Sequence, residues 1–277
     1  MPRPTVFILS ASADIGCALA GLYAADGWTV VGTYRQREGA RPLDAQPDVH
    51  LLPCDVARPE SIDAMVRDYR ALDRPWDVFV SAVGLLDPIG PWASLDFDAW
   101  EQSVMVNSTA QLRALHRLYP ERRLGAAVHA AFFAGGGTNG TFTNYSAYCV
   151  SKILLIKMCE LLDDELPDLN AFIVGPGFLP TKINRSTLEH PEAAGDNYRK
   201  TLEFYRTVDR AATYRDVYDC LHWCVAQGRA VVGGRNIALV HDGWREGGRL
   251  ASELRSDRHK FKLRRAGNTM PAHQGDV

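Results

Sequence analysis

Tyr148 and Lys152 stand four residues apart, a spacing that brings two side chains onto one face of a helix. Only six of the 31 basic residues are lysine, so a lysine at this position is informative. At ~5 Å and an effective dielectric constant of ~20, an ammonium group attracts a phenolate by ~3 kcal/mol. That attraction would lower a tyrosine pKa by roughly two units from its usual value near 10. The pair therefore predicts a tyrosine that exchanges a proton near neutral pH, with a chance pair as the alternative.

A loop at residues 10–16 follows the first apolar run and reads Ser10-Ala-Ser12-Ala-Asp14-Ile15-Gly16. Glycine-rich turns in this position hold the pyrophosphate of a dinucleotide at a helix N-terminus, and only Gly16 remains of the usual three glycines. Ser10 and Ser12 can still donate hydroxyl groups to phosphate. We expect Asp14 to cap the helix, with its carboxylate turned back to the helix amides. An ordinary strand-to-helix turn is the alternative to this cofactor loop.

Two later positions, Arg35 and Asp55, could contact the adenosine half of a dinucleotide and bear on which dinucleotide binds. A cofactor without a 2′-phosphate calls for an acidic residue after the second strand, and residues 33–37 contain none. Arg35 is instead placed to pair with a 2′-phosphate, which favours NADP(H) over NAD(H); a solvated loop is the alternative. Asp55 ends the third strand and either accepts a hydrogen bond from an adenine amino group or caps the turn before Pro59.

Short apolar runs alternate with helix-length segments along most of the 277 residues. This alternation indicates a parallel sheet covered on both faces. Seven strands without a break in composition favour a single domain, a Rossmann-like doubly wound α/β fold. Strands are expected at residues 6–10, 29–33, 50–53, 77–81, 126–133, 171–174 and 237–240. Helices are expected at residues 15–26, 59–72, 97–119, 144–166 and 214–226.

Two segments stand outside this alternation. Within a main domain of residues 1–244, the polar, partly helical residues 182–210 are expected to form a lid over the site. The lid carries side chains that suit a polar or anionic substrate such as a carbohydrate derivative, although a solvated helical face is the alternative. These are His190, Asn197, Tyr198, Lys200, Tyr205 and Arg206. Residues 245–277 form a charged extension, expected to be helical from about 248 to 258 and disordered after Ala266.

The overall charge and the cysteines exclude several classes of protein. A net charge of −2 gives no electrostatic case for binding nucleic acid or an anionic membrane. No apolar run approaches 18 residues, and the N-terminal run is too short for a signal peptide. Six scattered cysteines indicate a reducing cytoplasm. Cys220, His222 and Cys224 lack a second ligand pair, so we expect core packing and no metal site.

Taken in order, these motifs resemble those of the short-chain dehydrogenase/reductase family over about residues 5–243. The segment Tyr148-Cys-Val-Ser-Lys152 is similar to the family's Tyr-x-x-x-Lys, and Pro176-Gly177-Phe-Leu-Pro-Thr181 to its Pro-Gly-x-x-x-Thr. Other matches are Asn107, the pair Asp55-Val56, and Gly84. Gly84 is the last position of the family's Asn-Asn-Ala-Gly segment, whose asparagines are absent here.

The resemblance implies a role for each matched residue. Tyr148 would be the general acid/base for an alcohol–carbonyl pair, and Lys152 would lower its pKa and bind the nicotinamide ribose. Asn107 would help to hold a water that relays protons to Lys152. Thr181 and the backbone after Pro176 would hold the nicotinamide, while hydride transfer is the chemistry of the cofactor. Family members are usually homodimers or homotetramers, paired through the helices expected at residues 97–119 and 144–166.

The family's catalytic serine, expected thirteen or fourteen residues before the tyrosine, is missing, because Gly135 and Ala134 stand there. Loss of such a donor costs ~2–4 kcal/mol of transition-state stabilisation unless another group replaces it. Thr138 is the nearest substitute, ahead of Thr141, Thr143 and Asn139. Alternatively, the glycines make room for a bulky substrate.

The predicted function is an NADP(H)-dependent oxidoreductase that interconverts a secondary alcohol and a ketone on a small polar substrate. A non-catalytic dinucleotide-binding sensor or structural partner is one alternative, suggested by the missing serine and glycines. An epimerase or dehydratase that acts on an activated sugar and retains its cofactor is another.

Overall fold

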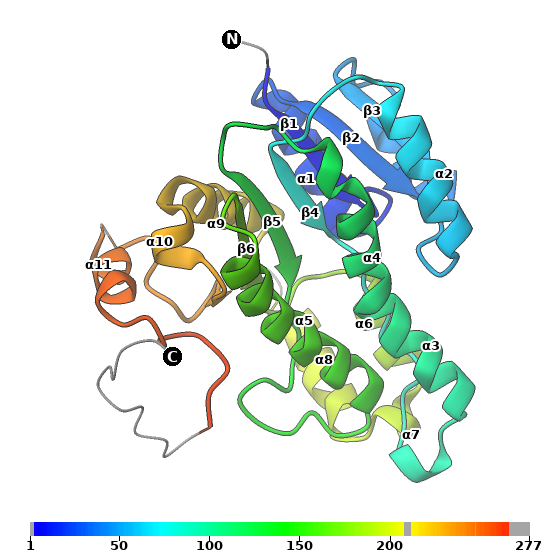
Figure 1. Cartoon of the computed structure of the whole chain (residues 1–277). Helices are drawn as coiled ribbons and strands as arrows, with labels where there is room; N and C mark the ends of the chain where they lie inside the picture. Colours follow the sequence, from blue (N-terminus) through cyan, green and yellow to red (C-terminus); the bar gives the residue numbers. More distant parts are fainter. Residues whose placement is uncertain (1–2, 208–211, 247, 266–277) are drawn as a thin grey trace.

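The computed structural model describes residues 3–207, 212–246 and 248–265 (Figure 1). Seven strands form one parallel sheet in the order β3-β2-β1-β4-β5-β6-β7. The chain crosses from one half of the sheet to the other between β3 and β4, which defines a doubly wound sheet. The expected fold class is therefore confirmed. The strands are β1 (Thr5–Leu9), β2 (Thr29–Tyr34), β3 (Val49–Pro53), β4 (Val78–Ser81), β5 (Val128–Phe133), β6 (Leu169–Gly175) and β7 (Asn236–Ala238).

Helices cover both faces of the sheet and enclose two hydrophobic cores. Alternate residues of β1 face opposite cores, since Val6 and Ile8 belong to one core while Phe7 and Leu9 belong to the other. The first core is closed by α1 (Asp14–Ala25), α9 (Tyr214–Gln227), α10 (Arg229–Val232) and α11 (Arg249–Ser256). The second is closed by α2 (Pro59–Arg70), α4 (Thr109–Leu118) and α5 (Ser146–Glu165).

The single helix expected at residues 97–119 is broken in two. It divides into α3 (Phe97–Asn107) and α4, because Ser108 leaves the helical conformation with φ −136° and ψ −80°. The side chains on either side of the break bond to other backbone groups: the Ser108 hydroxyl donates to the Val104 carbonyl at 2.6 Å, and Asn107 bonds to Leu85. Such local bonds compete with helical ones, and apolar periodicity does not reveal them.

The expected lid is a group of three short helices, α6 (Lys182–Glu189), α7 (Pro191–Ala194) and α8 (Asp196–Arg206). Figure 1 shows these helices beside α3 and α5, at the end of the molecule toward which β5 points. Residues 208–210 of the expected lid lie outside the described residues. A further short helix, η1 (Arg37–Leu43), follows β2 and was not expected from the sequence.

The C-terminal extension packs against the edge of the sheet. The buried Arg235 guanidinium donates to the carbonyls of Leu254 (2.6 Å), Asp257 (2.9 Å) and Lys260 (2.5 Å). The Asn236 amide of the edge strand β7 donates to the Phe261 carbonyl at 3.0 Å. The extension thus covers an otherwise open strand edge. Residues 266–277, where disorder was expected, lie outside the described residues.

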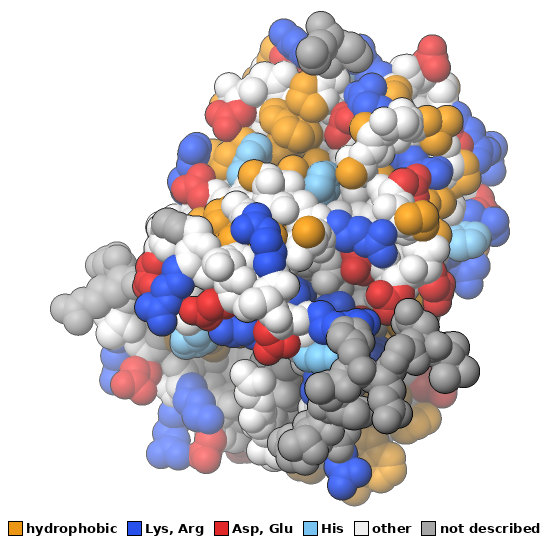
Figure 2. Space-filling model, turned by 60° about the vertical axis from the view of Figure 1, so that its left-hand side comes forward, with side chains coloured by type: hydrophobic (Ala, Val, Ile, Leu, Met, Phe, Trp, Pro, Cys, Tyr) orange, Lys and Arg blue, Asp and Glu red, His pale blue; other side chains and the backbone are white. Residues whose placement is uncertain are grey.

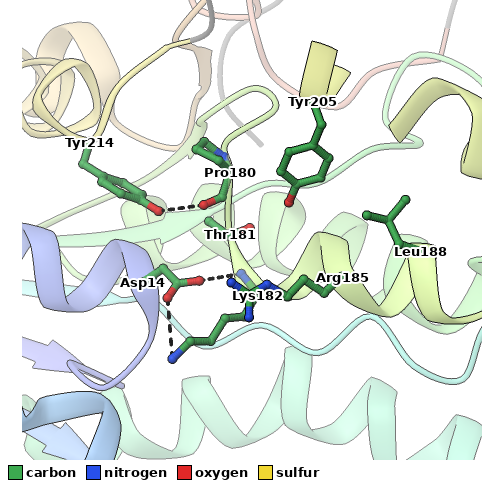
Figure 3. Close-up of a pocket in the computed structure, with 8 residues that line it drawn as sticks. All are labelled: Asp14, Pro180, Thr181, Lys182, Arg185, Leu188, Tyr205 and Tyr214. Atoms are coloured by element: carbon green, nitrogen blue, oxygen red, sulfur yellow. Dashed lines mark hydrogen bonds and ion pairs between the residues drawn. The ribbon is translucent and has the colours of Figure 1, made fainter. Parts of the chain in front are cut away.

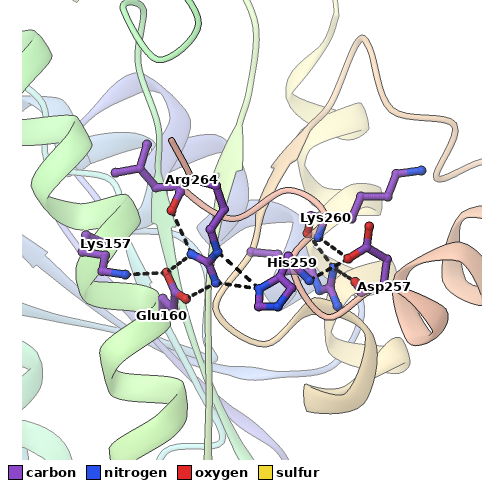
Figure 4. Close-up of polar contacts among 8 residues, drawn as sticks. Lys157, Glu160, Asp257, His259, Lys260 and Arg264 are labelled. Atoms are coloured by element: carbon purple, nitrogen blue, oxygen red, sulfur yellow. Dashed lines mark hydrogen bonds and ion pairs between the residues drawn. The ribbon is translucent and has the colours of Figure 1, made fainter. Parts of the chain in front are cut away.

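A charged cluster fastens the extension to α5. Arg264 donates to both carboxylate oxygens of Glu160, at 3.0 and 2.6 Å, and Lys157 donates to the same group at 2.9 Å (Figure 4). These contacts lower the pKa of Glu160 to about 2, although burial by itself would raise it. The carboxylate is therefore ionised at neutral pH and binds the extension as an anion.

The molecular surface mixes both signs of charge. On the face in Figure 2, Lys and Arg side chains are interspersed with Asp and Glu side chains. This arrangement agrees with the small net charge of −2. Among the described residues, the structure contains no helix that is both long and apolar enough to cross a membrane.

Candidate active site

Tyr148 and Lys152 lie on one face of α5, as their spacing predicts. The Lys152 Nζ atom is 5.7 Å from the centroid of the Tyr148 ring. Lys152 is buried, and its ammonium donates to the Val83 carbonyl after β4 at 3.4 Å. The two side chains therefore meet at the carboxyl ends of β4 and β5, where parallel sheets bind their ligands.

The pKa shifts in this pair are opposite to the expectation that Lys152 lowers the pKa of Tyr148. Burial raises the pKa of Tyr148 to about 12 and lowers the pKa of Lys152 to about 8. The reason is that low-dielectric surroundings disfavour both charged forms, phenolate and ammonium. At neutral pH Tyr148 is thus a neutral phenol that can donate a proton.

The position of the expected serine is filled by the Tyr148 ring. A Cβ atom at Gly135 would lie 2.4 Å from Cε1 of Tyr148 and 2.5 Å from its hydroxyl oxygen. These distances are too short, so no side chain fits at residue 135 unless the ring moves. Ala134 is buried. The Thr138 hydroxyl lies near this point and donates to the Gly135 carbonyl at 3.5 Å, at the limit of a hydrogen bond.

Asn107 is buried, and its side chain is hydrogen-bonded to the loop after β4. Its Oδ1 accepts from the Leu85 amide at 2.8 Å, and its Nδ2 donates to the Leu85 carbonyl at 2.6 Å. Gln111 of α4, four residues after Asn107, was not expected from the sequence to contribute here. Gln111 Nε2 donates to the Asn107 carbonyl at 2.7 Å, while its Oε1 accepts from Ser81 at 2.6 Å. The signal that could have indicated it is a glutamine on an otherwise apolar helix face.

Gln111 also reaches the environment of Lys152. Its Nε2 lies 3.5 Å from the Val83 carbonyl, which is the acceptor of the Lys152 ammonium. Ser81, Asn107 and Gln111 are fully buried, so each of these bonds replaces one with water. Together they attach the loop that carries Val83 and Gly84 to α3 and α4.

The cofactor loop retains one close approach that requires glycine. A Cβ atom at Gly16 would lie 2.2 Å from the Ser10 carbonyl oxygen, so only glycine brings the first turn of α1 this near. Ser10 adopts φ +66°, a conformation that favours glycine, and its amide donates to Thr33 Oγ1 at 2.8 Å. Ser12 lies in the turn before α1, whereas Ile15 and Gly16 lie in the first turn of this helix. The connection between β1 and α1 thus contains one glycine that the close packing requires.

Asp14 does not cap α1, contrary to our expectation. The N-cap of α1 is Ala13, and Asp14 is the first helical residue. Its Oδ2 instead accepts from the backbone amide of Lys182 at 2.5 Å, and its Oδ1 lies 3.8 Å from Lys182 Nζ. Asp14 therefore stabilises the start of α6, because a carboxylate interacts favourably with the amides of a helix N-terminus.

The remaining cofactor candidates follow the carboxyl ends of β2, β3 and β4. Arg35 is exposed and has no hydrogen-bond or ion-pair partner within the described part of the chain. Asp55 Oδ1 accepts from the Ala57 amide at 3.1 Å, so this carboxylate caps its own turn with one oxygen. Val56 packs against the second core. A Cβ atom at Gly84 would contact Ile183 of α6 at 3.2 Å.

The Pro176–Thr181 segment leads from β6 into α6. Gly177 adopts φ +73° and lies against Val240, so a side chain here would be both strained and crowded. Thr181 is buried and is the N-cap of α6. Beside this segment lies a cavity of about 360 Å³ (Figure 3). Its lining residues are Asp14, Pro180, Thr181, Lys182, Arg185, Leu188, Tyr205 and Tyr214.

The lid residues expected to suit a polar substrate do not gather at Tyr148. Asn197 donates to the Thr143 carbonyl at 3.0 Å, and His190 lies 3.9 Å from Asp87. Lys200 and Arg206 are exposed, and Tyr205 lines the cavity beside Thr181. Of these six residues, only Tyr198 joins the cluster of apolar and aromatic side chains to which Tyr148 belongs. The other members of that cluster are Leu86, Ile89, Phe142, Tyr145, Cys149, Ile183, Ala193 and Ala194.

The cysteine-rich turn of α9 lies in the first core. Cys220 and Cys224 are fully buried, and the His222 ring packs 4.2 Å from the Tyr218 ring, centroid to centroid. In the residues that the structure describes, no three His, Cys, Asp or Glu side chains are grouped as metal ligands.

Comparison with known proteins identifies the class. A family model described as enoyl-(acyl carrier protein) reductase matches residues 10–242. The chain therefore belongs to the short-chain dehydrogenase/reductase family, whose members are NAD(P)-binding oxidoreductases that act on alcohols and ketones.

Two curated relatives show how distant the similarity is. A serine 3-dehydrogenase of Rhizobium radiobacter is 23% identical over 229 residues, which cover 80% of this chain and 88% of the relative. A 3-oxoacyl-[acyl-carrier-protein] reductase of Escherichia coli (strain K12) is 26% identical over 193 residues, which cover 67% of this chain and 78% of the relative.

Solved structures support the same fold. A short-chain dehydrogenase/reductase from Saccharomyces cerevisiae matches with a TM-score of 0.79 and 16% identity, over 88% of this chain and 98% of that one. An actinorhodin polyketide ketoreductase solved with NADPH matches with a TM-score of 0.74 and 20% identity, over 85% and 95% of the two chains.

Proposed function

We propose that this chain is an NADP(H)-dependent oxidoreductase that interconverts a secondary alcohol and a ketone, with Tyr148 as the general acid/base. The observation that carries the proposal is the placement of Tyr148 and Lys152 on one face of α5, with the buried ammonium 5.7 Å from the phenol ring. A buried lysine is costly, and α5 would be more stable with an apolar residue at this position. That cost supports a functional role.

In the proposed reaction the cofactor transfers the hydride, and side chains of this protein transfer the proton. The nicotinamide supplies or accepts the hydride when bound. In the reducing direction Tyr148 donates its hydroxyl proton to the carbonyl oxygen, and its raised pKa keeps that proton available at neutral pH. Lys152, held by the Val83 carbonyl, favours the phenolate that remains and would bind the nicotinamide ribose. Asn107 supports this step by fixing the loop that carries Val83.

The choice of NADP(H) rests on Arg35. The guanidinium follows β2, is exposed, and has no hydrogen-bond or ion-pair partner among the described residues, so it is free to pair with a 2′-phosphate. Asp55 keeps one carboxylate oxygen for an adenine amino group. The loop with Ser10, Ser12, Ile15 and Gly16 and the segment with Pro176, Gly177 and Thr181 would hold the pyrophosphate and the nicotinamide. Comparative titration of NADPH and NADH tests the choice, because Arg35→Ala should weaken NADPH binding alone.

Thr138 is our candidate for the donor that replaces the serine. Its hydroxyl donates to the carbonyl of Gly135, and the Tyr148 hydroxyl lies against the same residue. In Thr138→Val, kcat should fall by about 10²-fold if this hydroxyl polarises the substrate oxygen. An unchanged kcat would leave the proton transfer by Tyr148 intact and would assign the polarisation to another group.

The side chains around Tyr148 indicate which class of substrate the site favours. Because the neighbouring side chains are apolar or aromatic, they favour a ketone with an apolar or aromatic group beside the carbonyl over the carbohydrate derivative suggested by the lid composition. A screen that pairs aryl and cyclic ketones with aldoses, followed by nicotinamide absorbance, separates the two classes.

The lid assignment rests on contacts between α6–α8 and the segment before α5. The Tyr145 and Thr187 hydroxyls are 2.9 Å apart, and Asn144 donates to the Ala193 carbonyl at 2.8 Å. These contacts support residues 182–210 as a lid beside Tyr148, of which the structure describes residues 182–207. Movement of these helices would admit substrate. Residues 248–265 belong to the separate extension, which covers the sheet edge through Phe261.

Assembly as a homodimer or homotetramer is supported by exposed apolar side chains on α3 and α5. Phe97 at the start of α3 and Val150 on α5 are 52% and 45% exposed, and Trp92 just before α3 is 63% exposed. Sedimentation of wild type and a Phe97→Glu variant tests the interface. The six cysteines are all free thiols, which supports the predicted cytoplasmic location.

The central test uses Tyr148→Phe. This variant should keep its fold and its affinity for NADPH but lose turnover, and Lys152→Arg should also fail because a guanidinium does not replace an ammonium here. Full turnover by Tyr148→Phe would remove the proposed mechanism. Nucleotide that copurifies with the protein and is not released would instead favour the epimerase or dehydratase alternative.

A further inference from the structure

The cavity of about 360 Å³ between α1 and α6 brings together charges that are distant in the sequence (Figure 3). Lys182 and Arg185 enter from α6, and Asp14 enters from the first turn of α1. Tyr205 and Tyr214 form an aromatic wall on the other side. The cavity adjoins the loop at residues 10–16, so a dinucleotide bound to this loop would place its phosphates here.

Asp14 and Lys182 are already paired. The carboxylate accepts from the Lys182 backbone amide at 2.5 Å and lies 3.8 Å from its ammonium. The Lys182 side chain is 64% exposed, so the ammonium can turn toward a ligand while the backbone contact remains. Arg185 has no ion-pair or hydrogen-bond partner in the part of the chain that the structure describes, although it lines the same cavity.

We propose that Lys182 and Arg185 form the subsite for the pyrophosphate of the dinucleotide, and that Asp14 weakens nucleotide binding by competing for Lys182. This inference rests on the proposed function, since it assumes that the cleft holds a dinucleotide. Two cations opposite one carboxylate leave one positive charge for the phosphates. Lysine and arginine both bind phosphate through charge-assisted hydrogen bonds. The basic residues of α6 thus take over part of the task of the absent glycines.

The pairing predicts an unusual response to mutation. Removal of the Asp14 charge should tighten NADPH binding by about tenfold, the effect of about 1.4 kcal/mol. Lys182→Met should weaken binding by a similar factor, because it removes a phosphate ligand and leaves Asp14 uncompensated. In the Asp14→Asn background the same lysine substitution should cost less, since the repulsive carboxylate is already gone. The two sites should therefore be coupled in a double-mutant cycle.

The experiment is a titration of NADPH into wild type, Asp14→Asn, Lys182→Met and the double variant, followed by tryptophan fluorescence. Inorganic pyrophosphate is then added as a competitor to wild type and to Arg185→Met. It should displace NADPH from wild type and lose at least several-fold in potency against Arg185→Met. Arg199→Met is the matched control, because Arg199 is exposed on α8, pairs with Asp196 and does not line the cavity.

The outcomes separate this inference from the proposed function. If NADPH binds wild type but Asp14→Asn binds no more tightly, or Lys182→Met behaves like Arg199→Met, the pyrophosphate subsite is overturned and cofactor binding stands. Pyrophosphate that competes equally well against wild type and Arg185→Met also overturns it. If NADPH binds to none of the variants nor to wild type, the proposed function falls together with this inference.

Discussion

The ring of Tyr148 occupies the space that a side chain at Gly135 would need. A Cβ atom there would lie 2.4–2.6 Å from the ring atoms Cε1 and Cζ and from the hydroxyl oxygen. The glycine at residue 135 is therefore what allows the Tyr148 ring to lie in this position. The phenol occupies the volume that a side chain at residue 135 would fill, and the Thr138 hydroxyl lies nearby.

Gly135→Ser should therefore reduce activity, although it restores the residue type of the family. The new Cβ forces the Tyr148 ring away, and misplacement of an acid/base by about 1 Å can cost 10²-fold in rate. The measurement is kcat of Gly135→Ser beside Gly140→Ser, whose Cβ would meet nothing within 4 Å. An increase in kcat for Gly135→Ser would mean that the serine, and not the present ring position, is what the reaction needs.

Lys152→Met should stabilise the protein while it abolishes turnover. The pKa of Lys152 is lowered from 10.5 to about 8, so the folded state binds its proton less tightly than the unfolded state. Below pH 8 the cost of burying the ammonium is fully present, and removing it should raise the free energy of unfolding by ~3 kcal/mol. Urea unfolding at pH 7 measures this, with the exposed Lys200→Met as control. A destabilised Lys152→Met would show that the ammonium contributes more than it costs.

The lowered pKa of Lys152 also predicts how the reaction rate depends on pH. In the reducing direction the lysine must carry its proton, so the rate should fall above about pH 8, by up to tenfold per pH unit. Tyr148, with a pKa of about 12, remains protonated throughout this range and adds no second limb. The check is kcat/KM for ketone reduction from pH 6 to pH 10, and a flat profile to pH 10 would contradict the assignment.

Gln111 should affect both the stability of the protein and the pKa of Lys152, and two substitutions separate these effects. Gln111→Leu leaves the Ser81 hydroxyl and the Asn107 carbonyl buried without this partner, at about 1–3 kcal/mol of unfolding free energy for each group. Gln111→Glu places an anion beside the Val83 carbonyl that Lys152 contacts, so it should raise the pKa of Lys152. The alkaline limb of the pH profile should move upward in Gln111→Glu. A purely structural role would lower stability without moving that limb.

Arg235 should anchor the C-terminal extension. Its buried guanidinium donates to three carbonyls of residues 254–260, so Arg235→Met should lower the free energy of unfolding by about 2–4 kcal/mol. The extension should also become accessible to protease, because it covers the β7 edge through the Phe261 carbonyl. Arg258→Met, on the exposed side of the same segment, is the control. Equal stability of the two variants would mean that the extension does not depend on this contact.

Features that depend on the local order of residues could be predicted before the structure was known. Alternating apolar runs and helical periods predicted the parallel sheet, because both faces of each strand are buried and every helix needs one apolar face. The four-residue spacing placed Tyr148 and Lys152 on one face of α5, since that spacing is a property of any α-helix. The motif order along the chain predicted the family in the same way.

Features that depend on packing between distant segments could not be predicted in this way, because local patterns do not show which segments meet. Asp14 contacts Lys182, 168 positions away, in place of the amides of its own helix. The α3–α4 break at Ser108 follows from bonds that Asn107 makes to the loop after β4. The shift in the pKa of Tyr148 has the opposite sign from our expectation, because burial is set by the whole fold while the spacing of Tyr148 and Lys152 fixes only their distance.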